Sequence, residues 1–105
     1  MKKLKFSYNW NNKLGCNAFT TLRLASDYWQ EGDLYEIFLK EGDQHKSLGW
    51  ARCKQIKRLT PDKINEFIGF LDTGYNAAKT RQIIKKMYPR KTNPEMYLML
   101  FVKQK

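Results

Sequence analysis

The chain has 105 residues and a formal net charge of +10, because it contains 20 Lys and Arg residues but only 10 Asp and Glu residues. This length predicts one domain over residues 1–105, and a hydrophobic content of 42% is enough for a core. No apolar run approaches the ~20 residues of a membrane-spanning helix. The basic N-terminus lacks the apolar region and the cleavage site of a signal peptide. We therefore expect a cytoplasmic protein with no membrane contact.

Cysteine and histidine are scarce. Cys16 and Cys53 form no C-x-x-C pair, and His45 is the only histidine. Two free thiols are the simplest interpretation, and a four-ligand zinc site cannot be assembled from these residues without recruiting carboxylates. The sequence thus predicts neither a metal nor a cofactor.

The first half of the chain predicts strands in succession. Residues 3–10 alternate apolar with polar, and "FTTLRL" (residues 19–24) is rich in β-branched residues. A turn at residues 31–33 precedes a strand over 34–39, and "EGDQHKS" (residues 41–47) has the composition of a loop. A long strand follows over 48–59, with Trp50 and Arg52 on one face and Ala51 and Cys53 on the other.

Two helices and a final strand are expected in the second half. Thr60 and Pro61 are suited to begin a helix with Ile64, Phe67, Ile68 and Leu71 on its buried face, and Gly74 to end it. Asn76 is suited to cap a second helix, whose expected buried stripe is Thr80, Ile83, Ile84 and Met87; Pro89 ends it. "MYLMLFVK" (residues 96–103) is apolar enough for both of its faces to be covered.

This order predicts an α+β fold, a small mixed β-barrel closed by the last strand, with two helices inserted before that strand and filling one end. Side chains fill the interior of so small a barrel, so a ligand is expected at a rim or in a cleft beside the helices.

The stretch "KLGCNAFTTLRL" carries the clearest candidate site. Alternation along its strand places Phe19, Thr21 and Arg23 on one face and Thr20, Leu22 and Leu24 on the other, with the two leucines in the core. A hydroxyl and a guanidinium two residues apart can reach one ligand, and the planar arginine fork suits a phosphate, a carboxylate or a base edge. A surface salt bridge for Arg23 is the alternative.

Charge and aromatic residues favour a nucleic-acid partner. Residues 79–91 hold six basic residues and no acid, which is typical of a surface that attracts polyanions. Lys85 and Lys86 also suit the C-terminal end of a helix dipole, so a plain solvated face is the alternative. Trp10 and Tyr75 are the aromatic residues expected to be exposed, and bases stack on such rings.

The order of these segments resembles the ASCH domain, a small relative of the PUA fold, over nearly the whole chain. Small members show a G-x-K-[TS]-x-T-x-R pattern, a Y-x-x-G-D turn and a Y-P pair before the last strand. The chain has T-x-R at Thr21–Arg23, G-D at Gly32–Asp33 and Y-P at Tyr88–Pro89. The resemblance implies a PUA-like barrel whose cleft receives RNA or a modified nucleoside.

Some small ASCH proteins are acetylcytidine amidohydrolases with a catalytic lysine, threonine and glutamate, and others are reported as nucleases. The resemblance places the threonine on Thr21 and the lysine on Ala18, so the catalytic ammonium is missing from the motif. Lys13 lies five residues earlier, and Asp72 is the only acid near the glutamate position.

Three functions therefore compete. The first is binding of RNA or a nucleotide through Thr20, Thr21, Arg23, Trp10, Tyr75, Lys85 and Lys86. The second is hydrolysis of a modified nucleoside or RNA by Thr21, Asp72 and Lys13, since amide hydrolysis needs an activated nucleophile and an oxyanion donor. The third is recognition of a protein through the basic helix. We expect binding, and whether the protein is an enzyme stays open.

Overall fold

The computed structural model describes residues 2–104, in an α+β fold. The predicted succession of four strands, two helices and a last strand is confirmed. Two 3₁₀ turns are added, η1 (Trp10–Gly15) and η2 (Pro61–Lys63). The strands are β1 (Lys2–Phe6), β2 (Ala18–Leu24), β3 (Leu34–Glu41), β4 (Gln44–Leu59) and β5 (Met96–Gln104), and the helices are α1 (Glu66–Asp72) and α2 (Ala77–Met87).

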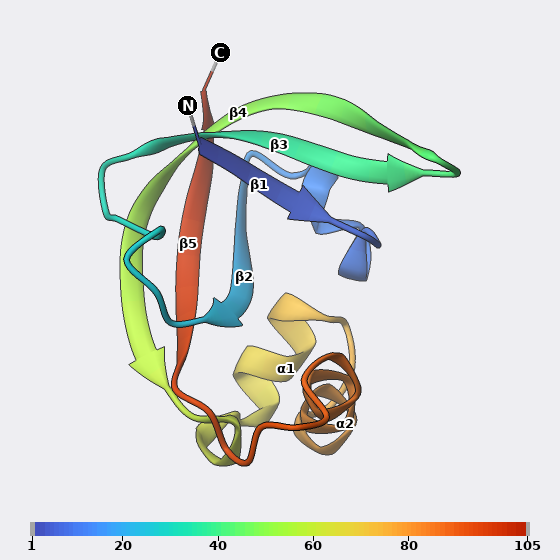
Figure 1. The fold of residues 1–105 in the computed structure, drawn as a ribbon, viewed down its shortest axis with the longest axis vertical. Coiled ribbons are helices and arrows are strands. Elements are labelled where there is room, and N and C mark those ends of the chain that lie inside the picture. The colour runs from blue at the N-terminus through green and yellow to red at the C-terminus, as the bar shows by residue number, and fades with distance from the viewer. Residues whose placement is uncertain (1, 105) are drawn as a thin grey trace.

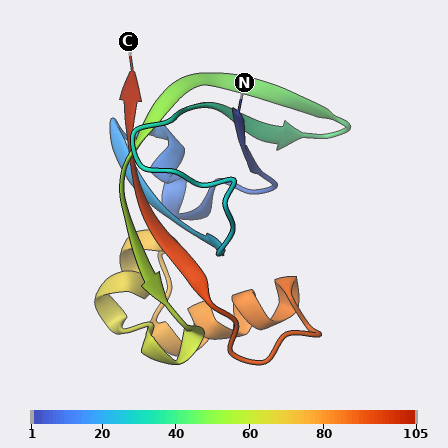
Figure 2. The same cartoon turned by 60° about the vertical axis from the view of Figure 1, so that its left-hand side comes forward.

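The five strands form one curled sheet in the order β1-β3-β4-β5-β2. β1 pairs parallel with β3, and the other neighbours are antiparallel. Figure 1 shows the sheet curving around its interior, with both helices at one end. Figure 2 shows β4 and β5 running side by side to that helical end.

The prediction of a closed barrel is wrong, because β1 and β2 are both edges of the sheet within the described residues. The last strand, β5, joins β4 to β2, but β1 ends at Phe6 after five residues. Tyr8, expected to continue the first strand, lies beyond it with 57% of its surface exposed. The sheet is therefore a half-barrel, and its two edges flank the cavity described below.

The core has two parts. The first fills the inside of the curled sheet and consists of Leu4, Phe6, Leu14, Phe19, Tyr35, Ile37, Ala51, Cys53, Met99 and Phe101. The second lies between the sheet and the helices and consists of Ile64, Ala77, Ile84 and Met96, with Leu22 and Leu24 packed against it. Ala51 and Cys53 share one face of their strand, as predicted, and the structure shows that this face points inward. β5 is not covered on both faces throughout, since Leu100 is exposed.

The segment predicted as a loop at residues 41–47 is a β-hairpin. Glu41 pairs with Gln44 across the two residues Gly42 and Asp43, and Gly42 has a φ of +59°. Gly at the first central position is typical of a two-residue hairpin turn. The strand ends on both sides of the turn are exposed and polar, and this composition made them resemble a loop.

The first helix begins later than predicted and buries a different face. α1 starts at Glu66, where the Asn65 side chain accepts a hydrogen bond from the Ile68 N–H at 2.8 Å. Phe67 and Leu71, predicted as buried, are 75% and 52% exposed. The buried face is formed instead by Gly69 and Asp72, because α1 packs on α2 through its glycine.

The second helix follows the prediction more closely. The Asn76 side chain caps α2 by accepting a hydrogen bond from the Lys79 N–H at 2.8 Å, and Gly74 takes the expected positive φ of +83° after α1. Thr80 and Ile84 are buried, as predicted. Met87, expected on the same stripe, is 48% exposed and lines a surface groove instead.

Candidate functional site

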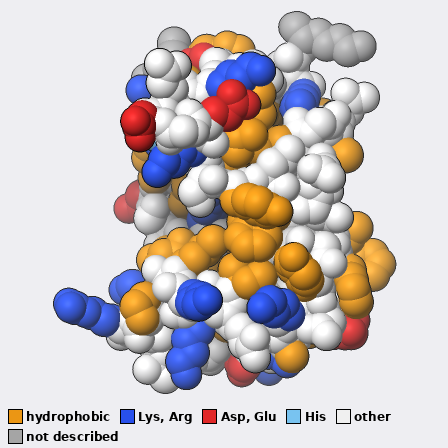
Figure 3. Space-filling model, turned by 90° about the vertical axis from the view of Figure 1, so that its right-hand side faces the viewer, with side chains coloured by type: hydrophobic (Ala, Val, Ile, Leu, Met, Phe, Trp, Pro, Cys, Tyr) orange, Lys and Arg blue, Asp and Glu red, His pale blue; other side chains and the backbone are white. Residues whose placement is uncertain are grey.

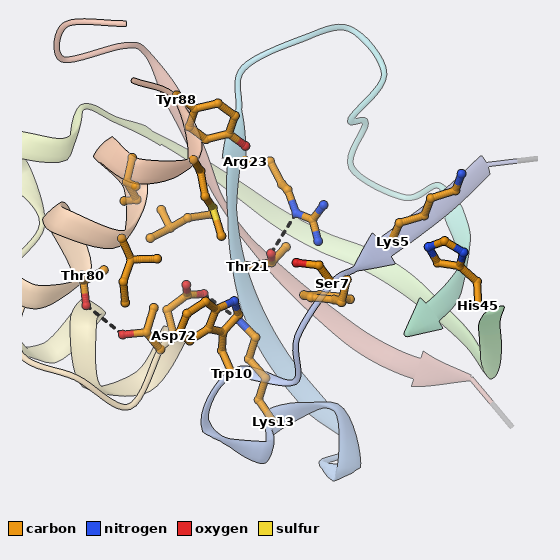
Figure 4. Close-up of a pocket in the computed structure, with 16 residues that line it drawn as sticks. Lys5, Ser7, Trp10, Lys13, Thr21, Arg23, His45, Asp72, Thr80 and Tyr88 are labelled. Atoms are coloured by element: carbon orange, nitrogen blue, oxygen red, sulfur yellow. Dashed lines mark hydrogen bonds and ion pairs between the residues drawn. The ribbon is translucent and has the colours of Figure 1, made fainter. Parts of the chain in front are cut away.

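A cavity of about 360 Å³ lies between the end of β1, the strand β2 and the helix α2. We call it the Arg23 cavity. Figure 4 shows the side chains around it, with Lys5 and His45 on one side and Tyr88 on another. Its lining residues are Lys5, Phe6, Ser7, Trp10, Lys13, Thr21, Leu22, Arg23, His45, Asp72, Thr73, Thr80, Ile83, Ile84, Met87 and Tyr88.

The 3₁₀ turn η1 carries Lys13 to the wall of this cavity. Asn11 and Asn12 take positive φ angles of 57° and 51°, a conformation that asparagine tolerates better than most residues. The Asn11 side-chain amide donates to the Phe70 carbonyl of α1 at 3.2 Å, which ties the turn to the helix. Lys13 is consequently only 5% exposed.

Lys13 forms a buried ion pair with the last residue of α1. Its Nζ lies 3.0 Å from Oδ1 of Asp72, and the Thr20 hydroxyl donates to the same oxygen at 3.0 Å. Burial lowers the pKa of Lys13 below its ordinary value; the Asp72 carboxylate opposes this shift and the Arg23 charge adds to it. A lysine, a carboxylate and a hydroxyl from three separate elements are thus held together.

The second carboxylate oxygen of Asp72 is available to a ligand. Among the described residues no side chain or backbone group donates a hydrogen bond to Oδ2, and no buried side-chain oxygen is without a partner. Oδ2 is therefore not fully buried, and Asp72 lines the Arg23 cavity. There it can accept a hydrogen bond from a ligand N–H, such as the exocyclic amine of a nucleobase.

Arg23 is held by one edge of its guanidinium group. Its Nε donates to the Thr21 hydroxyl at 3.1 Å, and its Cζ lies 4.6 Å from the ring centre of Phe6 and 5.8 Å from that of Trp29. Burial lowers the pKa of Arg23 from its ordinary value, an effect that Tyr88 and Asp72 oppose. Among the described residues, no acceptor binds the terminal amino groups. The site therefore presents a fixed, partly desolvated fork to an anion.

A second hollow of about 890 Å³ adjoins the Arg23 cavity and runs over the outer side of α2. We call it the α2 groove. It is lined by Trp10, Tyr75, Lys79, Gln82, Ile83, Lys85, Lys86, Met87 and Pro89. Three of these, Trp10, Ile83 and Met87, also line the Arg23 cavity, so the two hollows meet at Trp10.

The residues singled out in the sequence fall into these two hollows. Thr21, Arg23, Asp72 and Lys13 line the Arg23 cavity, and Thr20 is attached to it through Asp72. Tyr75, Lys85 and Lys86 line the α2 groove, and Trp10 lies between the two. Tyr75 is 46% exposed, whereas Trp10, also expected to be exposed, is half-buried.

Sequence reasoning missed other parts of the Arg23 cavity, above all Lys5, Phe6 and His45. His45 was missed because its hairpin was predicted as a polar loop, and nothing in the local sequence places that segment beside β2. Lys5 and Phe6 come from the end of β1, and only the open edge of the half-barrel brings that end opposite β2. The polar–apolar alternation of β1 indicates which side chains are buried, but it does not predict that the end of β1 lies opposite β2.

Neither the family models, the curated proteins nor the solved structures contain a match to this chain. None of the described helices is long and apolar enough to cross a membrane. Within residues 2–104, no group of three or more His, Cys, Asp and Glu side chains could hold a metal ion. Both cysteines are free thiols, Cys16 exposed and Cys53 buried.

Proposed function

We propose that the protein binds RNA or a nucleotide, with an anionic group of the ligand on Arg23. The observation that carries this proposal is the state of the guanidinium, which is fixed through Nε to Thr21 and leaves its terminal amino groups to the cavity. Lys5 and Lys13 line the same cavity against a single carboxylate among the described residues, that of Asp72. Such a field favours a phosphate.

The rest of the cavity supports a base as the second part of the ligand. Its walls include the half-buried aromatic residues Trp10 and Tyr88, on which a planar group can stack. Oδ2 of Asp72 can accept a hydrogen bond from an exocyclic amine. We therefore expect cytosine, adenine or guanine to bind more tightly than uracil, whose ring lacks that amine.

The proposal includes membership of the ASCH domain within the PUA-like folds. It is supported by the order of the T-x-R, G-D and Y-P motifs and by a half-barrel sheet with two helices at one end. It also includes a cytoplasmic location, where RNA and nucleotides are abundant.

The test is calorimetric titration with a cytidine nucleotide and with cytidine. The nucleotide should bind more tightly than the nucleoside. Arg23→Lys should weaken nucleotide binding by about tenfold, because a lysine keeps the charge but loses the planar fork. Arg90→Lys is the matched control, since Arg90 is exposed and lines neither hollow. Equal affinities of the two variants, or no binding to either ligand at low salt, would contradict the proposal.

Hydrolysis of a modified nucleoside is the second candidate. It is favoured by one observation, namely that Lys13, Asp72 and Thr20 are joined by hydrogen bonds beside Thr21 and Arg23. Arg23 could polarise a carbonyl, and the Lys13–Asp72 pair could relay a proton to or from an attacking water. This set compensates in space for the lysine that Ala18 replaces in the motif.

The second candidate is tested by incubating concentrated protein with N4-acetylcytidine and measuring the acetate released. Release that disappears in Thr21→Ala, with the unfolding transition unchanged, would establish the hydrolase. Intact acetylcytidine after prolonged incubation, together with tight nucleotide binding, would leave binding as the function.

A further inference from the structure

The α2 groove has the composition of a surface for single-stranded nucleic acid. Its lysines Lys79, Lys85 and Lys86 are all exposed, and no acidic residue lines it among the described residues. Figure 3 shows the side of the molecule where hydrophobic side chains gather in the middle and Lys and Arg side chains lie toward the helical end. Cations beside apolar surface are what a strand of stacked bases with a charged backbone requires.

The aromatic residues of the groove form two differently oriented platforms. The rings of Trp10 and Tyr75 have centroids 6.5 Å apart and an interplanar angle of 76°. Tyr8 meets Trp10 on the other side at 4.7 Å and 67°, and it is 57% exposed. A base stacked parallel to the Tyr75 ring would therefore lie at a steep angle to the Trp10 ring, close to the Arg23 cavity that Trp10 also lines.

The two hollows are neighbours, which suggests the path of a longer ligand. Trp10, Ile83 and Met87 belong to both, so a chain that leaves the Arg23 cavity passes Trp10 and enters the α2 groove. The combined volume exceeds what a mononucleotide in the first cavity uses, since the groove alone measures about 890 Å³.

From the adjacency of the two hollows and the lysines and aromatic residues of the groove, we propose that the ligand is a single-stranded oligonucleotide. One nucleotide occupies the Arg23 cavity, the next base stacks at Tyr75, and the following phosphates lie on Lys85 and Lys86. This inference rests on the proposed function and extends it from a nucleotide to a strand of defined length. It assigns the basic run of α2 to the phosphate backbone rather than to solvent or a protein partner.

The experiment is a length series, with fluorescence anisotropy on labelled single-stranded oligocytidylates and competition by the unlabelled mononucleotide. Affinity should rise by about tenfold on addition of a second nucleotide and rise again with a third or fourth, after which it should level off. Tyr75→Ala should remove the first increment. Phe67→Ala is its control, because Phe67 is an exposed aromatic residue that lines neither hollow.

A double variant tests the phosphate contacts. Lys85→Ala with Lys86→Ala should lower the slope of log affinity against log salt by about 1.4, which is about 0.7 for each phosphate contact on a single strand. Mononucleotide affinity should fall less than the affinity for the longest oligonucleotide, because neither lysine lines the Arg23 cavity. Lys54→Ala with Lys57→Ala, two exposed lysines of β4, makes the same charge change elsewhere.

The outcomes separate this inference from the proposed function. Mononucleotide binding with no gain from length would overturn the inference and leave the proposed function intact. A failure to bind any nucleotide or oligonucleotide would overturn both. Equal slopes of log affinity against log salt for the two double variants would show that the phosphates do not lie on Lys85 and Lys86. If a polyglutamate peptide bound more tightly than every oligonucleotide and lost that affinity in the Lys85 and Lys86 variant, the groove would belong to a protein partner.

Discussion

At the scale of single residues, Lys13 and Asp72 form an ion pair that is almost completely buried. The two side chains are only 6% and 7% exposed, so neither charge is well solvated without the other. Lys13→Met removes the cation and leaves a buried carboxylate with only the Thr20 hydroxyl as donor. The free energy of unfolding should fall by about 3–5 kcal/mol, as measured by urea denaturation.

Arg58→Met is the control for that loss. Arg58 and Glu95 form an ion pair whose side chains are 73% and 53% exposed, and solvent screens such pairs. This variant should lose less than about 1 kcal/mol. Comparable losses in the two variants would show that Lys13 is not a buried charge in solution.

The buried Cys53 thiol makes the free energy of unfolding depend on pH in the alkaline range. Burial raises the pKa of this thiol from 9.0 to about 11, and the Glu31 and Asp33 carboxylates add to the shift. Above pH ~9 the unfolded chain releases this proton and the folded protein retains it, so the thiol's contribution to stability falls as pH rises. Between pH ~8 and ~10 the loss should be about 1 kcal/mol.

Cys53→Ala isolates this effect. The variant loses packing at every pH, but its deficit in unfolding free energy relative to the wild type should shrink by about 1 kcal/mol over the same interval. The lowered pKa of Lys13 acts in the opposite direction, since there the unfolded chain holds the proton more firmly and stability rises with pH. That effect is common to both proteins and cancels in the difference. A pH-independent deficit would mean that the thiol titrates normally.

At the scale of elements, the close approach of α1 to α2 depends on one glycine. A Cβ added at Gly69 would lie 2.8 Å from the Tyr75 carbonyl oxygen and 3.0 Å from the Thr80 hydroxyl. Alanine normally stabilises a helix relative to glycine by up to about 1 kcal/mol. Here Gly69→Ala should instead destabilise the fold by about 1–3 kcal/mol, because the helices must separate.

Gly15→Ala serves as the comparison, because nothing lies within 4 Å of an added Cβ there and the backbone φ is ordinary. It should change the free energy of unfolding by less than about 0.5 kcal/mol. If thermal denaturation gave a Gly69→Ala variant as stable as Gly15→Ala, the packing of α1 on α2 would be looser than described.

The helices and β4 show which features of an element can be predicted from the local sequence. The N-terminal cap of α2 and the alternation of β4 were predictable, because each depends on residues that are close in sequence. Asn76 caps an amide three residues further on, and Ala51 and Cys53 are two positions apart in one strand. The buried face of α1 was not. Its apolar residues Phe67 and Leu71 suggested an inward stripe, whereas the small residue Gly69 faces the neighbouring helix. A seven-residue helix is too short for periodicity to decide between these faces.

At the scale of the whole molecule, the open edge of the sheet decides where the site lies. The order of elements was predictable, but barrel closure was not, since it depends on whether β1 and β2 are long enough to meet. They do not pair within the described residues, and the space between them becomes the Arg23 cavity. Alternation along β2 predicted that Thr21 and Arg23 share a face, and both line this cavity together with Asp72. Their assembly with Lys5 and His45 was not predictable, because those contacts join distant segments.

The most direct test of nucleotide binding in the Arg23 cavity is a nuclear magnetic resonance titration of the labelled protein with a cytidine nucleotide. The amide signals of Thr21, Arg23 and Asp72 and the side-chain Nε–H signal of Arg23 should shift together and saturate. Signals on the opposite side of the sheet, such as that of Lys54, should stay in place. A nucleotide that leaves the cavity signals unmoved, or that shifts only exposed lysines without saturation, would contradict the account.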